Sequence, residues 1–338
     1  MEKTHVSKDK VVFEVDGETF WQSGKRIVLP KYILEDGQKQ NLIFNWHESL
    51  ANIPTLSRNY VFSERLQSKV IELDLNDVDV LLDPRKTLQK FVRKELKNEL
   101  SDKIVYVCSI LDGFGIKSED IGIGGSNLTG LTTKSSDIDL LIYGSKNRLK
   151  LVNNLDKLFS SRRIGSILSN EDVMDTLYQR RKLHFSSLDE VSLVKSEKRR
   201  VQGLVDDTRF VFAFIRESKP NYYNSIERIE PLVPIVLEGR ISSATVPFEP
   251  LITHLRTEKV LSSIGNEESL LMNRPILCIS HNPIYAIQYF VGEQVYVAGM
   301  LERVTSSIGD SFYQIGIRYH HDIPKEIKII RDLGKSLC

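Results

Sequence analysis

Glycines, a serine and two aspartates in the middle of the chain constrain its fold more than any other feature. Gly124-Gly125-Ser126 follows a short apolar run, and Asp137-Ile138-Asp139 opens the next apolar run. Residues i and i+2 of a strand point to the same face, so the two carboxylates converge on one point. The apolar residues after them predict a buried strand, where isolated charges are costly. The sequence therefore predicts a glycine turn between two strands, with an acidic pair on the second strand.

These residue types suit a metal ion bound together with phosphate groups. A hard divalent cation such as Mg²⁺ (or Mn²⁺) takes paired carboxylates, and phosphates and water complete its coordination. Gly124 and Gly125 permit backbone geometry that a Cβ forbids, and the N–H groups of such a turn can hold phosphate oxygens. The Ser126 hydroxyl adds a donor. The pattern indicates phosphoryl or nucleotidyl transfer assisted by metal ions; an acidic pair on a solvated face is the alternative.

Polar residues beside the aspartates are further candidates for contact with a nucleotide. Ser135 and Ser136 could contact it, although capping the entry to the strand is the favoured interpretation. Lys134 and Lys146 could reach phosphate groups, or remain solvated as most surface lysines do.

The run Ile123-Gly124-Gly125-Ser126, a spacer with Gly130, and Asp137-Ile138-Asp139 resembles the signature of the DNA polymerase beta-type nucleotidyltransferase superfamily. The wider layout is similar to a group of uncharacterised archaeal predicted nucleotidyltransferases. The resemblance implies that Gly125 and Ser126 bind the triphosphate of an NTP, and that Asp137 and Asp139 bind Mg²⁺. A hydroxyl would attack the α-phosphorus and pyrophosphate would leave.

The resemblance also implies a third carboxylate on a later strand, where it helps to activate the attacking hydroxyl. The matching strand should be Arg209–Ile215, which contains no acidic residue. Asp206 and Asp207 precede this strand and Glu217 follows it, and Asp207 lies nearest to a usable strand position. We therefore take Asp207 as the candidate third carboxylate. Without one, catalysis would be slow, would use another base, or would be absent.

The rest of the chain is expected to form an α+β protein around this motif. Residues 1–82 are rich in strand signals and form either a separate part or an extension of the core. Asp83-Pro84 predicts a helix start, with apolar positions continuing to Leu100. The nucleotidyltransferase core, a mixed sheet with flanking helices, is expected over 83–219. Residues 220–338 read as strands with glycines at the bends, which predicts a small antiparallel barrel that resembles an oligonucleotide-binding (OB) fold.

Two strand predictions concern the N-terminal region. Val11–Val15 and Glu18–Trp21 flank Asp16-Gly17, a tight-turn dipeptide, and this pattern is typical of a hairpin. Lys25–Leu34 reads as an extended stretch with Pro30 inside it. Because proline cannot donate a hydrogen bond to a neighbouring strand, we expect an edge strand there.

Charge gives no overall signal for a polyanionic partner, because the net charge is only +1. A local cluster of basic residues between positions 180 and 200 is more informative, since it could pair with an RNA backbone or form a solvated helix face. Tyr296 and Tyr313 of the predicted barrel could stack on bases or fill its core. The cluster consists of Arg180, Arg181, Lys182, Lys195, Lys198, Arg199 and Arg200.

Cysteine usage and the N-terminus bear on location. Cys108, Cys278 and Cys338 are widely spaced and form no CxxC pair, which argues against a disulfide framework or a zinc ribbon. The polar N-terminus is no secretory signal, and no apolar run approaches a membrane span. We expect a cytoplasmic protein with no membrane partner.

Two main functions stay open at this point, beside a third, an interaction protein in which the barrel matters more than the transferase core. The first is Mg²⁺-dependent transfer of an NMP from an NTP to a hydroxyl of an RNA end, a protein or a small molecule. The second is a catalytically inactive nucleotide- or RNA-binding module that lacks the third carboxylate.

Overall fold

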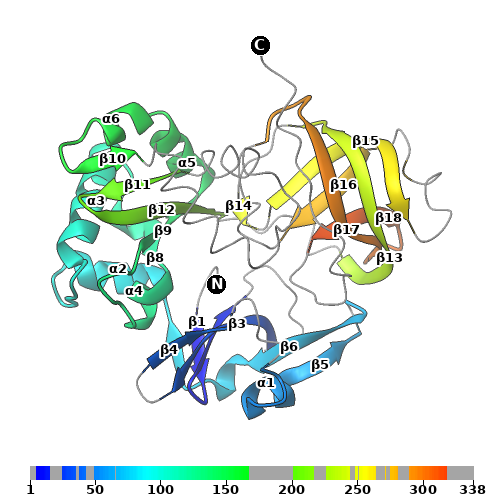
Figure 1. Ribbon diagram of the computed structural model, residues 1–338, viewed down its shortest axis with the longest axis horizontal. Helices are drawn as coiled ribbons and strands as arrows, with labels where there is room; N and C mark the ends of the chain where they lie inside the picture. Colours follow the sequence, from blue (N-terminus) through cyan, green and yellow to red (C-terminus); the bar gives the residue numbers. More distant parts are fainter. Residues whose placement is uncertain are drawn as a thin grey trace. The chain divides into compact units, whose positions relative to one another are not determined.

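The computed structural model describes most of the chain in two compact units, drawn in sequence colours in Figure 1. The first unit contains an N-terminal sheet and an α/β core, and the second contains a β-barrel. Helices and strands occur together, which confirms the α+β class. The described residues are 5–15, 25–35, 38–42, 49–64, 66–166, 201–216, 226–243, 248–249, 251–263, 271, 275–280 and 289–317.

The N-terminal sheet, blue in Figure 1, has the strand order β5-β6-β3-β2-β1-β7, and β4 pairs with β3. Phe13, Leu56 and Leu73 are fully buried in its core. Its elements are β1 (His5–Lys8), β2 (Val11–Val15), β3 (Lys25–Glu35), β4 (Gln38–Asn41), α1 (Pro54–Asn59), β5 (Tyr60–Ser63), β6 (Ser68–Asp74), a 3₁₀ turn (Leu75–Asp77) and β7 (Val80–Leu82).

The prediction of an edge strand over Lys25–Leu34 is wrong. β3 lies inside the sheet, between β2 and β6. Pro30 stands opposite Phe13, beside a register shift between Val12 and Phe13. Such a bulge interrupts the ladder and so accommodates a residue without an N–H group. β2 pairs with β3, and the predicted hairpin partner Glu18–Trp21 lies outside the described residues.

The α/β core contains a sheet with the strand order β10-β11-β12-β9-β8. β9 pairs parallel with β12 and antiparallel with β8. Ile138, Leu140 and Ile142 alternate along β9 and are fully buried. The elements of the core are α2 (Pro84–Val92), α3 (Ser101–Gly113), a 3₁₀ turn (Ser118–Asp120), β8 (Ile121–Ile123), α4 (Gly125–Thr129), β9 (Ile138–Tyr143), α5 (Ser145–Val152), α6 (Leu155–Phe159), β10 (Ile164–Ser166), β11 (Gln202–Val205) and β12 (Thr208–Ile215).

The helix start predicted at Asp83-Pro84 is confirmed, but its predicted length is wrong. The Asp83 side chain accepts hydrogen bonds from the N–H groups of Arg85 (2.9 Å) and Lys86 (3.1 Å), as an N-cap does. α2 ends at Val92 and does not continue to Leu100. Lys94 has a φ of +61°, a left-handed conformation that cannot continue a right-handed helix.

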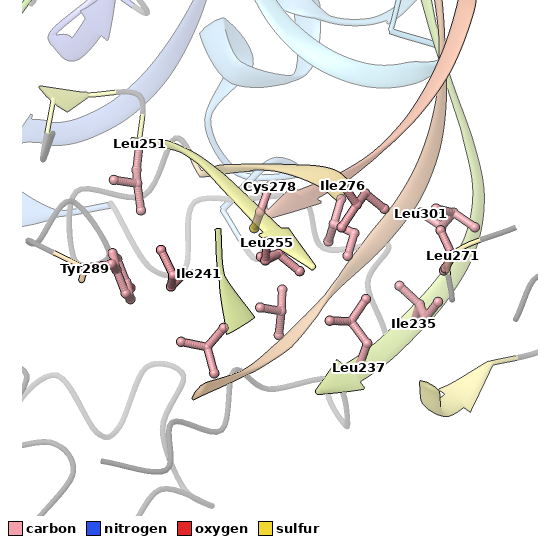
Figure 2. Close-up of a cluster of buried hydrophobic side chains, with 13 residues drawn as sticks. Ile235, Leu237, Ile241, Leu251, Leu255, Leu271, Ile276, Cys278, Tyr289 and Leu301 are labelled. Atoms are coloured by element: carbon pink, nitrogen blue, oxygen red, sulfur yellow. The ribbon is translucent and has the colours of Figure 1, made fainter. Parts of the chain in front are cut away.

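The second unit is a closed barrel with the strand order β13-β15-β16-β18-β17. β16 and β18 pair parallel, which differs from the antiparallel prediction, and the other pairs are antiparallel. Figure 2 shows its core, where Leu237, Leu255 and Leu301 are fully buried. The barrel strands are β13 (Ile226–Ile241), β15 (Leu251–Ser263), β16 (Pro275–Ser280), β17 (Gln294–Ser306) and β18 (Ser311–Ile317), and the short strand β14 (Phe248–Glu249) is not part of the barrel.

The structure bears on the predictions for the cysteines, for membrane spans and for the basic cluster only where it describes these residues. Cys108 and Cys278 are buried free thiols, and burial raises the pKa of each to about 12. Within the described residues, no helix is both long and apolar enough to cross a membrane. The basic cluster at 180–200, Glu217 and Cys338 lie outside the described residues.

Candidate active site

The glycine turn is joined to the acidic strand by a hydrogen bond. The register of β8 and β9 pairs Ile123 with Leu140. One step further, the Gly124 N–H donates to the carbonyl of Asp139 at 2.8 Å. Gly124 therefore lies beside Asp139, and its N–H is used by the sheet and is not available to a phosphate group.

The two halves of the sequence motif meet at Asp139. Asp137 precedes β9 and is exposed, whereas Asp139 is the second residue of β9 and is half-buried. Gly125 has a φ of +57°. A Cβ added to Gly125 would overlap the Oδ2 atom of Asp139, so the carboxylate lies directly against the turn. The structure thus brings Gly125 and Asp139 together, with Asp137 two residues away along an extended backbone.

Backbone donors stand next to this carboxylate. The first hydrogen bond of α4 runs from the Leu128 N–H to the Gly124 carbonyl at 3.2 Å. The N–H groups of Gly125 and Ser126 therefore have no partner within the helix, as is usual for the first residues of a helix. Donors beside a carboxylate pair can hold phosphate oxygens that share a cation with the carboxylates.

Alanine at Gly125 should disable the site, whereas alanine at Gly130 should not. Both glycines have positive φ, +57° and +73°, so each substitution costs about 1 kcal/mol of backbone strain. A Cβ on Gly130 meets nothing within 4 Å, whereas a Cβ on Gly125 displaces the Asp139 carboxylate. We expect Gly125→Ala to weaken Mn²⁺ binding by about 10-fold or more, and Gly130→Ala to leave it unchanged. Electron paramagnetic resonance of free Mn²⁺ measures both affinities, and equal affinities would contradict the assignment of Asp139 to a metal site.

The charge of the acidic pair acts on a neighbouring phenol. The pKa of the Tyr32 hydroxyl is raised, first by burial and then by the negative charges of Asp139, Asp137 and Glu14. Since like charges disfavour one another, the phenolate form is penalised there. A cation bound by the two aspartates would relieve this penalty.

Ser136 and Lys134 lie in the turn that leads to Asp137. The Ser136 hydroxyl accepts a hydrogen bond from the Thr133 N–H at 2.9 Å, and the Ser136 N–H donates to the Thr133 carbonyl at 3.0 Å. This is the local role that caps a turn. Lys134 is exposed in the same turn.

Sequence reasoning missed two asparagines beside the motif. Asn127 is only 1% exposed, and its amide nitrogen donates to the Asp137 carbonyl at 3.0 Å. Asn98, from the segment between α2 and α3, donates to the Asn127 side chain at 3.1 Å. A polar residue directly after Gly-Gly-Ser was a usable signal for Asn127, whereas nothing local pointed to Asn98.

The structure does not bring Asp207 to the acidic pair. Asp206 and Asp207 form the turn of the β11–β12 hairpin, after Val205 and before Thr208. The parallel register pairs Phe210 with Ile138, which places Arg209 level with Asp137. Asp207 precedes Arg209 by two residues and so lies beyond the level of Asp137. Lys103 binds its carboxylate, and this hydrogen bond lowers the pKa of Asp207.

Asp206 is also engaged elsewhere, with its carboxylate bound by Arg163 at 2.7 Å. The same guanidinium group binds Asp102 at 2.8 Å. These ion pairs fasten the hairpin turn to α3 and to the start of β10, so both acids of the turn have structural partners.

β12 presents no acid on the face that it shares with Asp139. Val211 is the partner of Asp139 in the parallel register, and Ala213 is the partner of Leu141. Arg209 lies two residues before Val211 on the same face, and its guanidinium group hydrogen-bonds Gln202. Val211 therefore occupies the position where a third carboxylate would lie beside the pair.

Comparison with known proteins agrees with this geometry. Residues 107–228 match the family model of the nucleotidyltransferase domain. This segment is a nucleotidyltransferase domain. It includes the glycine turn, both aspartates and β12, and it confirms the polymerase beta-type resemblance.

A relative of the chain is archaeal. An uncharacterized protein of Methanocaldococcus jannaschii is 27% identical over 219 residues, which is 64% of this chain and 60% of that protein. The match covers only part of this chain and spans less than two thirds of the relative. No solved structure matches the chain.

Proposed function

We propose that the nucleotidyltransferase domain moves a nucleoside monophosphate from an NTP to a hydroxyl acceptor with the help of Mg²⁺ or Mn²⁺. The observation that supports this most is the Asp139 carboxylate lying against Gly125, with Asp137 two residues before it. In the reaction, the acceptor oxygen forms a bond to the α-phosphorus. The bond from that phosphorus to the bridging oxygen breaks, pyrophosphate leaves with the electron pair, and the proton of the acceptor hydroxyl passes to water.

Each motif residue has a part in this proposal. Asp137 and Asp139 fit a hard divalent cation, because both offer carboxylate oxygens and leave the remaining positions to phosphates and water. Such a cation stabilises negative charge on the phosphate oxygens. Gly125 and Ser126 donate their N–H groups to the triphosphate, and the Ser126 hydroxyl is a further donor. Gly124 shapes the turn.

Transfer of label from NTPs tests this proposal. The purified chain is incubated with Mg²⁺ and each of the four α-labelled NTPs, with total RNA and then protein extract as acceptors. Label that appears in one acceptor class, and is lost in EDTA, supports the proposal and names the nucleotide and the acceptor class. No transfer to any acceptor, small molecules included, would contradict it.

A second function is favoured by the position of Val211. With Val211 beside Asp139 and Asp207 bound by Lys103, the site has no third carboxylate among the described residues to accept the proton of the acceptor. Loss of a positioned base costs about 10²- to 10⁴-fold in rate. An NTP-binding module without catalysis therefore predicts metal-dependent NTP binding and no label transfer.

Substitution of Asp207 tests whether this residue acts as the general base. Asp207→Asn removes the carboxylate but keeps the side-chain volume in an exposed turn. Because Asp207 is bound by Lys103 away from the acidic pair, we expect label transfer to stay within about 2-fold of wild type, against about 10²-fold or more for a general base. A loss of transfer with unchanged melting temperature would instead identify Asp207 as the base.

RNA is the acceptor class that we propose first. The barrel has the strand order first-second-third-fifth-fourth, with its third and fifth strands parallel, and this order is typical of OB folds, which bind oligonucleotides. The basic residues at 180–200 would add contacts to phosphates. Transfer of label to protein but not to RNA would overturn this choice of acceptor.

A further inference from the structure

The two aspartates are held in place by different means. Asp139 belongs to β9, where its carbonyl accepts the Gly124 N–H at 2.8 Å and Val211 is its partner on β12. Asp137 precedes the strand and is exposed. Its carbonyl accepts the side-chain amide of Asn127 at 3.0 Å. The Asp137 backbone is therefore held by a hydrogen bond from a buried side chain, whereas the Asp139 backbone is held by the hydrogen bonds of the sheet.

The orientation of the Asn127 amide is itself fixed. Its Oδ1 atom accepts a hydrogen bond from the amide nitrogen of Asn98 at 3.1 Å and from the Thr132 hydroxyl at 3.3 Å. Two donors on the oxygen leave the nitrogen of Asn127 to donate to Asp137. Asn98 is anchored in turn, because its Oδ1 atom accepts the Leu100 N–H at 2.9 Å just before α3.

This network ties the start of β9 to the glycine turn. Asn127 lies on α4, one residue after Ser126, so any shift of Asp137 away from the turn would break the bond to a side chain that is 1% exposed. A buried amide that loses its partner is costly, so the bond resists such a shift. Residues that orient metal ligands in this way usually contribute to metal affinity without touching the metal.

We propose that Asn127 is a positioning residue which, oriented by Asn98, holds Asp137 where its carboxylate shares a cation with Asp139. The inference rests on the proposed metal–nucleotide site and adds to it a residue that positions one of the proposed metal ligands. Asn127 acts through Asp137 and needs no contact with substrate.

The other end of β9 offers a matched control. Asn147 is 7% exposed, and its amide nitrogen donates to the Tyr143 carbonyl at 2.9 Å. Asn127→Ala and Asn147→Ala thus each remove a buried amide and one hydrogen bond to a carbonyl at an end of the same strand. A purely structural role predicts that both variants lose melting temperature and keep Mn²⁺ affinity.

Mn²⁺ binding to the full chain separates the two roles. Free Mn²⁺ is titrated by electron paramagnetic resonance, and melting temperatures are measured in EDTA. We expect Asn127→Ala to weaken Mn²⁺ binding by about 10-fold, Asn98→Ala to weaken it in the same direction, and Asn147→Ala to leave it unchanged. Asn98→Ala is the second variant if Asn127→Ala does not fold, because it leaves Asn127 in place and removes its orienting donor, together with the bond from the Leu100 N–H.

Three results would count against the proposal. Wild-type affinity in both Asn127→Ala and Asn98→Ala would overturn it, as would an equal loss in Asn147→Ala. A wild-type chain that binds no Mn²⁺ would overturn the proposed function on which the inference rests, which distinguishes the two failures.

Discussion

Replacing Asp137 and Asp139 together by asparagine should abolish nucleotidyl transfer without unfolding the chain. The two carboxylates are the residues that fit a divalent cation, and asparagine keeps their shape while removing both charges. Charge stabilisation by a bound metal is worth several kcal/mol, which corresponds to a fall of about 10³-fold or more in the rate of label transfer. The fold should persist, because Asp137 is exposed and Asp139 is half-buried.

Thermal shifts distinguish loss of the site from loss of structure. A ligand that binds the folded state raises the melting temperature, so Mn²⁺ should stabilise wild type and leave the Asp137→Asn/Asp139→Asn variant unchanged. Asp206→Asn/Asp207→Asn is a matched control, since it removes the same charge from the hairpin turn of the same domain. Full transfer activity in the Asp137→Asn/Asp139→Asn variant would contradict the assignment.

The second large effect is an increase in the rate of label transfer. Val211→Asp should raise the rate of label transfer by about 10²-fold, because it places a carboxylate beside Asp139, at a position of β12 where the wild-type chain has a valine. Val211 is 9% exposed, so the new carboxylate should also lower the melting temperature in EDTA. Added Mn²⁺ should restore part of this loss, because the cation compensates the extra negative charge.

Val211→Asn separates the charge from the change in shape. Asparagine has nearly the size of aspartate but cannot accept a proton at neutral pH, so its transfer rate should stay at the wild-type level. If Val211→Asp is folded, binds Mn²⁺ and is no faster than Val211→Asn, then the proton of the acceptor leaves by another route. For the non-catalytic alternative, Val211→Asp is the variant in which activity should first appear.

Local features of the site could be predicted from the sequence, because they depend on neighbours in the chain. The acidic pair needs only strand periodicity, and the Asp83 cap needs only two N–H groups within three residues. The end of α2 could not be predicted in this way, because apolar residues continue beyond Val92 and only the left-handed Lys94 ends the helix.

Features that depend on strand register could not be derived. Asp207 directly precedes β12 in sequence, but one hairpin turn decides whether its side chain faces the acidic pair or Lys103. Pro30 suggested an edge strand, whereas a bulge places it inside the sheet. The Asn98–Asn127 contact joins residues 29 positions apart, and no periodicity in the chain connects them.

Calorimetric titration of a non-hydrolysable NTP analogue tests the central claim most directly, which is that Asp137, Asp139 and the glycine turn form one metal–nucleotide site. It requires wild type with Mg²⁺, wild type with EDTA, and the Asp137→Asn/Asp139→Asn variant with Mg²⁺. The account predicts saturable binding in the first titration and a loss of at least about 10-fold in affinity in the other two. Equal affinity in all three titrations would show that neither the metal nor the aspartates take part in binding, and would contradict the account.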